Sequence, residues 1–302
     1  MNVTFRQMRL FLALAEKGSV SAAAKAMHIT QPTASMQLRQ IAKSIGVPTH
    51  EADGRGVRLT EAGQKLASTA RTLFGTWEEF EQELAASRGL KAGRLRIAVV
   101  STAKYFMPKI VGSFCRVHPQ VDVSLEILNR DGVVQRLRDG MDDLYIMSMP
   151  PPDMALEDEV ILPNPIVVVT SLNDELCRAR HLTLKDLQGR SLVLREPGSG
   201  TRMAADRYFR RQRFRPEVRF ELGSNEAIKQ IVSAGLGIGI LSRHALQGWA
   251  SNLKIRELEV KGFPLPSAWH LVRPSTRRLS PVATAFRTHL LEAIDAKKLS
   301  LI

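Results

Sequence analysis

Apolar residues recur at helical spacing from the start of the chain. The spacing predicts a first helix over residues 4–17, capped by Thr4 and ended by Gly18. Its apolar stripe is expected to consist of Phe5, Met8, Leu12 and Ala15. A second, short helix is predicted over residues 21–27, with Ser21 as its N-cap. Both helices are expected to pack with a third into a small three-helix unit.

The third helix begins at Thr30-Gln31-Pro32, where a capping residue precedes a first-turn proline, and it is predicted to continue to Ile45. Its apolar positions fall at i, i+4, i+7 and i+11, namely Ala34, Leu38, Ile41 and Ile45. The tight turn between the second and third helices is typical of a helix-turn-helix. The alternative interpretation is a small amphipathic helical pair in a folding core, with a solvated polar face.

The other face of this third helix carries side chains that hydrogen-bond to base edges and phosphates, and its first turns would enter a major groove. After it, Gly and Pro residues break the helix, and residues 57–59 have strand character, which predicts a β-wing along the phosphates. The candidate DNA-binding residues are Ser21, Gln31, Pro32, Thr33, Ser35, Met36, Arg39, Lys43, Arg55 and Arg58.

Residues 61–88 are predicted to form one long helix with a narrow apolar seam. The apolar residues are spaced alternately by four and three positions, as in a coiled coil: Leu66, Ala70, Leu73, Trp77, Phe80 and Leu84. A dimer that pairs this seam would place two recognition helices on one face, as two DNA half-sites require. The alternative is that the seam docks on its own chain.

Strands and helices alternate after a junction at residues 89–93. This alternation favours an α/β fold with parallel sheets that carry helices on both faces. Strands are predicted at residues 95–100, 121–128, 144–147, 166–170, 191–194, 218–221, 238–241 and 269–272. Helices are predicted at residues 102–117, 133–138, 184–187, 201–211, 226–234 and 281–294. Two such lobes suit a ligand bound between them.

These patterns predict the domain organisation. We expect a winged helix-turn-helix DNA-binding domain over residues 1–60 and a dimerisation linker helix over residues 61–88. The first effector lobe is expected to combine residues 93–163 with residues 268–302, which follow a proline-rich break. Residues 164–267 are expected to form the second effector lobe.

Composition narrows the class of partner. The 302 residues are 44% hydrophobic and carry a formal net charge of +13, with a pI near 10.2. Such a charge indicates a polyanionic partner, with nucleic acid first and an anionic membrane second. Residues 1–60 hold eight Lys and Arg against three acidic residues, so the excess is densest around the helix pair. Because no apolar run approaches the ~18 residues of a membrane span and no signal peptide is evident, we expect a soluble, cytoplasmic protein without a membrane partner.

Two strand-to-helix turns are candidates for an anion site. Free backbone N–H groups and hydroxyls converge at residues 101–102, and residues 197–202 repeat that arrangement in the second lobe. The candidate effector-binding residues are Ser101, Thr102, Asn129, Arg130, Arg195, Ser199, Thr201 and Arg202. For either turn alone, the alternative is an ordinary turn that uses Gly and Ser for its geometry.

The sequence gives no positive sign of catalysis, and we expect no catalytic residue, no metal and no cofactor. Residues 198–200 lack the spacing of a nucleophile elbow, and the glycines of residues 235–239 precede a strand, so they do not form a dinucleotide fingerprint. The seven His residues are scattered. Cys115 and Cys177 stand far apart without clustered ligands, so we expect ordinary thiols.

A combined motif lies at residues 22–24 (AAA), 30–39 (TQPTASMQLR) and 58–63 (RLTEAG). With this motif the chain resembles the LysR-type transcriptional regulators over essentially its full length. The resemblance implies an N-terminal winged helix-turn-helix, a dimerising linker helix, and an effector domain of two periplasmic-binding-protein-like lobes, usually in tetramers. One departure is at residues 49–52, Thr-His-Glu-Ala, where the family wing commonly reads Leu-Phe-Glu-Arg, so wing contacts must rest on Arg55 and Arg58.

Residues 101–108 and 195–202 resemble the branch of that family that regulates Calvin-cycle (RuBisCO) operons and responds to phosphorylated metabolites or nicotinamide nucleotides. We therefore expect a regulator that binds double-stranded DNA as a homodimer or homotetramer. A small anionic metabolite would change the angle between the lobes, the bending of DNA and the recruitment of RNA polymerase. Two alternatives stay open: an α/β enzyme or ligand-binding protein with a helical dimerisation module, and an architectural DNA binder.

Overall fold

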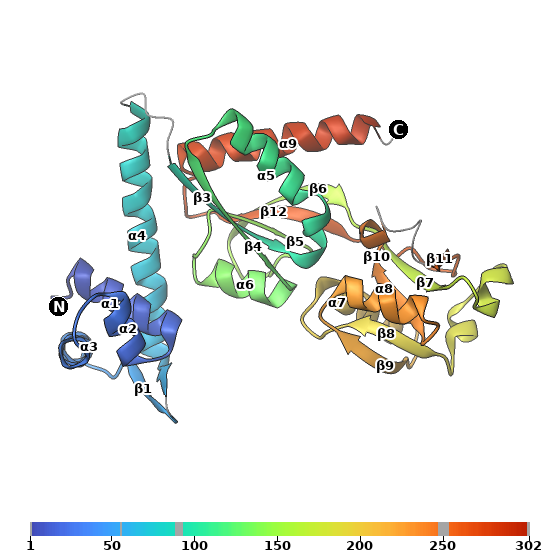
Figure 1. Ribbon diagram of the computed structural model, residues 1–302, viewed down its shortest axis with the longest axis horizontal. Helices are drawn as coiled ribbons and strands as arrows, with labels where there is room; N and C mark the ends of the chain where they lie inside the picture. Colours follow the sequence, from blue (N-terminus) through green and yellow to red (C-terminus); the bar gives the residue numbers. More distant parts are fainter. Residues whose placement is uncertain (1, 55, 88–92, 247–253, 301–302) are drawn as a thin grey trace. The chain divides into compact units, whose positions relative to one another are not determined.

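The computed structural model describes residues 2–54, 56–87, 93–246 and 254–300 (Figure 1). The chain divides into two compact units, Met1–Arg88 with Arg138–Met141, and Gly89–Leu137 with Asp142–Ile302. The first unit carries the helix-turn-helix, the hairpin and the long helix, and the second carries two α/β lobes. The predicted fold class, an N-terminal winged helix-turn-helix followed by a two-lobed α/β effector domain, is confirmed.

The first unit is built around a shared core of α1, α2 and α3. Its elements are α1 (Phe5–Lys17), α2 (Val20–Ala26), α3 (Gln31–Ile45), β1 (His50–Asp53), β2 (Gly56–Leu59) and α4 (Glu61–Ser87). Thr4 caps α1 and Gly18 ends it in the left-handed conformation, as predicted. Of the predicted apolar positions of α3, three are fully buried in this core: Ala34, Leu38 and Ile41.

The prediction for the start of α2 is wrong. Its N-cap is Ser19, not Ser21, and Ser19 makes no side-chain capping bond. The first helical hydrogen bond runs from the Ala23 N–H to the Ser19 carbonyl at 2.9 Å. Because Gly18 reverses the chain, Ser19 is already in an extended conformation and the helix can start at Val20. Ser21 therefore lies inside the helix, with its side chain exposed.

The predicted apolar stripe of α1 is also displaced. The residues that α1 buries fully are Leu10, Phe11 and Leu14. Phe5, a member of the predicted stripe, is half exposed and contacts the rings of Phe74 and Trp77 in α4 edge-on. α1 is covered by α2, α3 and α4 together, so tertiary packing and not helical periodicity alone decides which residues it buries.

The predicted wing is a two-stranded antiparallel hairpin in which Glu51 lies opposite Arg58. Thr49, which replaces the family's apolar anchor, is fully buried. Its carbonyl accepts the Thr60 N–H at 3.2 Å. The Thr60 hydroxyl in turn donates to the Pro48 carbonyl at 2.7 Å. One backbone hydrogen bond and one from the Thr60 side chain therefore hold the segment before β1 against the start of α4.

Gly63 stands where the start of α4 touches this segment. A Cβ built on Gly63 would lie 1.8 Å from the Thr49 carbonyl oxygen, so no larger residue fits without displacing backbone. The Gly63 N–H also donates to the Thr60 hydroxyl at 3.1 Å, which caps the helix. The motif at residues 58–63 thus has a structural cause, a close backbone crossing.

The apolar seam of α4 divides into two parts. Leu66 packs against the helix-turn-helix core and Ala70 is fully buried. The four residues beyond them are between 41% and 48% exposed: Leu73, Trp77, Phe80 and Leu84. The first part therefore docks on its own chain, and the second part lies on the surface.

The first lobe contains one five-stranded sheet in the order β4-β3-β5-β12-β6. α5 and α9 pack together on one face of this sheet, and α6 lies on the other face (Figure 1). The ring centroids of Phe114 in α5 and Phe286 in α9 are 5.1 Å apart. The elements are β3 (Gly93–Val100), the 3₁₀ helix η1 (Ser101–Tyr105), α5 (Met107–Val117), β4 (Val121–Leu128), α6 (Arg130–Arg138), β5 (Leu144–Met147), β6 (Leu156–Pro163), β12 (Ala268–Pro274) and α9 (Pro281–Ser300).

The second lobe contains a sheet in the order β11-β7-β10-β8-β9. β7 is buried throughout because its alternate residues face two different cores, Ile166 and Val168 toward α7, Val167 and Val169 toward α8. The elements are β7 (Ile166–Ser171), η2 (Glu175–Arg178), η3 (Leu184–Leu187), β8 (Ser191–Arg195), α7 (Gly200–Arg211), β9 (Glu217–Leu222), α8 (Asn225–Ser233), β10 (Ile238–Ser242), η4 (Arg243–Leu246) and β11 (Ile255–Leu258).

Both sheets are mixed, which corrects the prediction of parallel sheets. β12 runs antiparallel to β5 and β6, and β7 runs antiparallel to β10 and β11. The sequence pattern misses β6 and β11, which lie at sheet edges and carry charged residues toward solvent. The helix predicted over residues 102–117 is broken into η1 and α5, because Pro108 cannot donate within a continuous helix.

We predict that Gly63→Ala destabilises the chain by about 1–3 kcal/mol, because the new methyl group must displace the Thr49 carbonyl. The matched control is Gly112→Ala in the middle of α5, where nothing lies within 4 Å of the new Cβ. That control should be neutral or stabilising by up to about 1 kcal/mol. Urea unfolding followed by circular dichroism measures both, and equal midpoints for the two variants would contradict the close crossing.

Candidate DNA interface and candidate effector site

α3 presents polar side chains at every fourth position: Gln31, Ser35, Arg39 and Lys43. Ser35 links two of them, because its hydroxyl accepts from the Gln31 amide at 3.2 Å and its carbonyl accepts from Arg39 Nε at 3.3 Å. Gln31, Arg39 and Lys43 are exposed, and the buried face of the helix fixes their direction. The arrangement suits contacts to base edges and phosphates.

The remaining candidate residues of the helix pair surround this stripe. Pro32 is exposed in the first turn of α3, and the Thr33 N–H donates to the hydroxyl of the N-cap Thr30 at 3.4 Å. Met36 is half exposed, which would allow an apolar contact with a thymine methyl group. Ser21 is exposed on α2.

The wing offers one described cation. Arg58 on β2 is exposed and its guanidinium is 2.5 Å from the Glu51 carboxylate across the hairpin. An ion pair this exposed is weak, so a phosphate can compete for the guanidinium. Arg55, the second predicted wing contact, lies outside the described residues.

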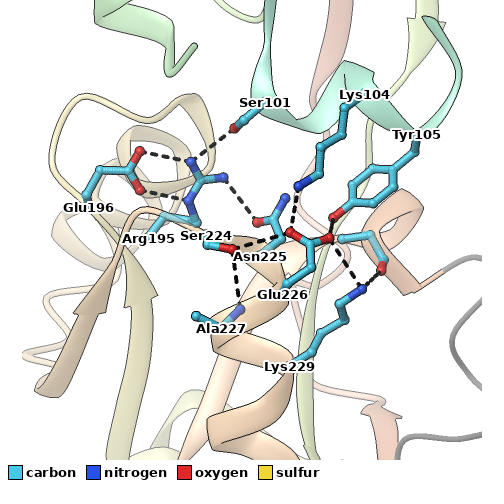
Figure 2. Close-up of polar contacts among 11 residues, drawn as sticks. Ser101, Lys104, Tyr105, Arg195, Glu196, Ser224, Asn225, Glu226, Ala227 and Lys229 are labelled. Atoms are coloured by element: carbon cyan, nitrogen blue, oxygen red, sulfur yellow. Dashed lines mark hydrogen bonds and ion pairs between the residues drawn. The ribbon is translucent and has the colours of Figure 1, made fainter. Parts of the chain in front are cut away.

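In the second unit, Arg195 at the end of β8 is 1% exposed. Its guanidinium makes two bonds to Glu196, at 2.7 and 2.8 Å, and one to Asn225 Oδ1 at 3.1 Å. A further bond reaches the first lobe, where the Ser101 hydroxyl accepts from Nη2 at 3.1 Å (Figure 2). Ser101 and Arg195, both predicted site residues, are therefore in contact across the two lobes.

The other two predicted arginines also have protein partners. Arg202 on α7 bonds to Asp206 at 3.0 Å, to Glu221 at 2.9 Å and to the Arg195 carbonyl at 2.9 Å. Arg130 on α6 donates from Nε to the Met149 carbonyl at 2.8 Å. In this arrangement, these guanidinium groups organise the turns around the inter-lobe contact.

The predicted hydroxyl and amide residues sit at the starts of helices. Ser199 caps α7 by accepting from the Arg202 N–H at 3.1 Å, and Asn129 caps α6 by accepting from the Gly132 N–H at 2.9 Å. Thr102 accepts from Trp269 Nε1 at 3.0 Å, and Thr201 is buried in the first turn of α7. The Asn129 and Ser199 turns meet where the Asp131 N–H donates to the Gly198 carbonyl at 3.1 Å.

A second group of inter-lobe contacts, which the sequence does not reveal, is centred on Glu226 of α8. Lys104 and Tyr105 reach its carboxylate from η1 in the first lobe, at 2.5 and 2.7 Å (Figure 2). From its own lobe the carboxylate contacts the Ser224 hydroxyl at 3.3 Å and Lys229 Nζ at 3.7 Å. Lys229 is buried and also donates to the Ala245 carbonyl at 2.9 Å.

These contacts and burial shift the pKa values of Glu226 and of two side chains that contact it. Burial by itself raises the pKa of Glu226, but hydrogen bonds from Lys104 and Tyr105 more than offset it and lower the pKa to about 2. Since 4.5 is the ordinary value, the carboxylate's ionic contacts are fully present above that pH and are lost only as the pH falls through about 2. Burial raises the pKa of Tyr105, which stays a hydrogen-bond donor, and burial lowers the pKa of Lys229.

Asn225 lies between the two groups of contacts. It is 2% exposed, and its Oδ1 accepts from Arg195. Its amide nitrogen lies near the Tyr105 hydroxyl, where it acts to lower the pKa of that group, but it makes no hydrogen bond of good geometry with the described residues. Figure 2 shows this nitrogen pointing toward the first-lobe residues Ser101 and Lys104. A buried donor without a well-placed acceptor is costly, so the position favours an acceptor supplied from outside the protein.

The contacts around Glu226 have a recognisable pattern in the sequence. Ser224-Asn225-Glu226 follows β9 and opens α8, the same strand-to-helix arrangement that pointed to residues 101–102 and 197–202. Lys104 and Tyr105 lie within the segment 101–108 that carries the branch resemblance. What the sequence does not show is that positions separated by 122 residues, Lys104 and Glu226, meet.

The described residues contain no helix with both the length and the apolar character needed to cross a membrane. Nor do the described His, Cys, Asp and Glu side chains gather in threes as a metal site would need. Cys115 and Cys177 are both partly buried free thiols.

Comparison with known proteins gives two family matches. Residues 5–64 match the bacterial regulatory helix-turn-helix protein, lysR family, and residues 88–295 match the LysR substrate binding domain. The HTH-type transcriptional activator CmpR of Synechocystis sp. is 38% identical over 301 residues, covering 100% of this chain and 99% of that protein. A RuBisCO operon transcriptional regulator of Acidithiobacillus ferrooxidans is 40% identical over 292 residues, covering 97% and 94%.

A solved structure of a regulatory domain resembles part of this chain. The regulatory domain of CcmR from Synechocystis PCC6803, in complex with 2-PG, is 36% identical with a TM-score of 0.65, covering 67% of this chain and 97% of that one. The helix-turn-helix, the two lobes and these full-length matches agree with one another. The chain belongs to the LysR family of bacterial transcriptional regulators.

Proposed function

We propose that this chain is a DNA-binding regulator of carbon-fixation genes, switched by a small anionic metabolite that binds between its two effector lobes. The observation that carries the proposal is full-length similarity, at 38 and 40% identity, to an activator named CmpR and to a RuBisCO operon regulator. The related CcmR regulatory domain holds 2-phosphoglycolate, so that compound is the first candidate effector.

The contacts between the lobes support an anionic ligand. Hydroxyl, ammonium and amide donors from both lobes converge there: Ser101, Lys104, Tyr105, Asn225 and Lys229. The predicted residues Thr102, Asn129, Arg130, Arg195, Ser199, Thr201 and Arg202 would shape the turns around the ligand, the arginines mainly through their protein partners. A phosphate or carboxylate accepts from such donors with charge-assisted bonds.

The DNA-binding role is assigned to residues 1–60, with α3 as the recognition helix. Gln31, Ser35 and Arg39 would read base edges, and the other candidate residues of the helix pair and wing would contact phosphates or the thymine methyl group. Residues 61–88 would dimerise the chain through the exposed part of the α4 seam. Two recognition helices would then read half-sites about one turn, ~34–36 Å, apart.

Binding of the effector would be coupled to transcription through the angle between the two lobes. Residues 93–163 with 268–302, and residues 164–267, would form the two lobes whose angle the effector changes. In a homotetramer this change would alter DNA bending and the recruitment of RNA polymerase. A differential affinity of roughly 1–3 kcal/mol between the two states would suffice. The site of action would be the cytoplasm, where the operator DNA is.

We predict that Arg39→Ala weakens specific DNA binding by roughly 1–3 kcal/mol, because the exposed Arg39 side chain on the polar face of α3 would lose its contact with a base edge. The duplex is one that the wild-type chain selects from a random pool, and fluorescence anisotropy measures the affinity. Lys65→Ala, which removes an exposed lysine paired with Glu61 on α4, is the control and should bind within twofold of wild type. Equal affinity and equal discrimination for Arg39→Ala would remove Arg39 from the readout.

We also predict that the full chain binds 2-phosphoglycolate and that Ser101→Ala weakens this binding about three- to tenfold, the worth of one hydrogen bond. Isothermal titration calorimetry provides the affinities. Ser275→Ala is the control, since the Ser275 hydroxyl bonds to the Ala155 carbonyl outside the inter-lobe contacts. Chemical conversion of 2-phosphoglycolate in this experiment would favour the alternative that the chain is an enzyme. In the DNA-binding experiment, equal affinity for all sites would favour the alternative that the chain is an architectural DNA binder.

A further inference from the structure

Glu226 is surrounded as a bound anion would be. Its two oxygens receive Lys104 and Tyr105 from the first lobe, at 2.5 and 2.7 Å. The Ser224 hydroxyl at 3.3 Å and the Lys229 ammonium at 3.7 Å approach from the second lobe (Figure 2). This one carboxylate therefore contacts donors from both lobes, which is also what a small anionic effector would have to do.

The donors around Glu226 make a site in their own right. Glu226 belongs to the first turn of α8, whose backbone N–H groups favour negative charge. The adjacent Asn225 is 2% exposed, and its amide nitrogen makes no hydrogen bond of good geometry with the described residues. If the Glu226 side chain turned outward, Lys104 and Tyr105 would join this nitrogen as donors to whatever anion took its place.

Of Glu196 and Glu226, the second is the carboxylate suited to leave. Glu196 neutralises Arg195, which is 1% exposed, and removing that partner would leave a buried charge unpaired. Glu226 is 36% exposed, and its partner Lys104 is 32% exposed, so water can solvate both groups once they separate. Glu226 also lies 3.7 Å from Lys229, which is 1% exposed, but Lys229 keeps its hydrogen bond to a backbone carbonyl at 2.9 Å and would pair with the anion that replaces the carboxylate. The Glu226–Lys104 contact can therefore exchange at a smaller cost than the Glu196–Arg195 contact.

We propose that Glu226 is a tethered competitor of the effector, an internal anion that an incoming phosphate or carboxylate must replace on Lys104 and Tyr105. The inference rests on the proposed function, since it takes the inter-lobe region as the effector site. Exchange moves the first-lobe donors from a carboxylate of α8 to a diffusible anion. Glu226 thereby sets the concentration at which the regulator responds, and it excludes neutral ligands, which have no charge to offer Lys104 in return.

The test is effector binding to the full-length chain carrying Glu226→Gln, which keeps the shape of the side chain and removes its charge. Isothermal titration calorimetry with 2-phosphoglycolate, and separately with inorganic phosphate, should show affinity higher than wild type by about fivefold or more. The control is Glu257→Gln in the same lobe, where Glu257 pairs with Arg243 on the protein surface. Its affinity for both anions should equal that of wild type.

A second variant separates competition from a general loosening of the lobe. In a Lys104→Gln background, Glu226→Gln should give a smaller gain, because the cation for which carboxylate and effector compete is absent. An equal gain in both backgrounds would overturn the proposal. Thermal melting of each variant identifies any that fail to fold, in which case Glu226→Asp, whose shorter side chain draws the carboxylate back from Lys104, takes its place with the same expected direction.

The outcomes distinguish this inference from the proposed function. If wild type binds 2-phosphoglycolate and Glu226→Gln binds it no more tightly, the tethered competitor is overturned and the effector assignment stands. If Glu226→Gln gains affinity for phosphate but 2-phosphoglycolate has no advantage over phosphate, the competitor stands and that effector is wrong. If no variant binds either anion, both proposals fail.

Discussion

The buried guanidinium of Arg195 constrains the whole inter-lobe region. A charge that is 1% exposed has to be paired and fully hydrogen-bonded, or it would destabilise the fold by several kcal/mol. The partners that meet this demand come from three elements: Glu196 follows the same strand, Asn225 opens α8, and Ser101 opens η1 of the other lobe. Pairing one charge therefore fixes two helix starts and one inter-lobe contact at once.

The contacts around Glu226 depend on that arrangement. Because Arg195 holds Asn225 through its side-chain oxygen, the first turn of α8 is fixed with Glu226 facing the first lobe. η1 then supplies Lys104 and Tyr105 from the turn that starts at Ser101. A rigid pair, Arg195 and Glu196, thus lies beside an exchangeable one, Lys104 and Glu226. This combination is what a ligand-operated switch needs, a fixed frame and a contact that can be replaced.

Local features of the fold were predictable from the sequence, and long-range pairings were not. α3, its cap and the hairpin follow from helical periodicity, Thr30, Pro32 and the glycines around the wing. The alternation of apolar and polar residues does not reveal β6 and β11, because these edge strands carry charged residues. The N-cap of α2 is Ser19 and not Ser21, because the preceding glycine sets the direction of the chain. For the effector region, the residue types predict polar side chains at the starts of helices. The sequence does not show that Arg202 pairs with a carboxylate and Arg130 with a backbone carbonyl, because those partners come together only on folding.

The central claim is that the chain is a ligand-responsive regulator of carbon-fixation genes. Genome-wide DNA occupancy of the tagged protein, with and without a carbon-fixation growth regime, tests it most directly. We expect sharp peaks at a carbon-fixation operon that shift in strength or position with the regime. Sharp peaks only at other operons, unchanged between the two regimes, would contradict it.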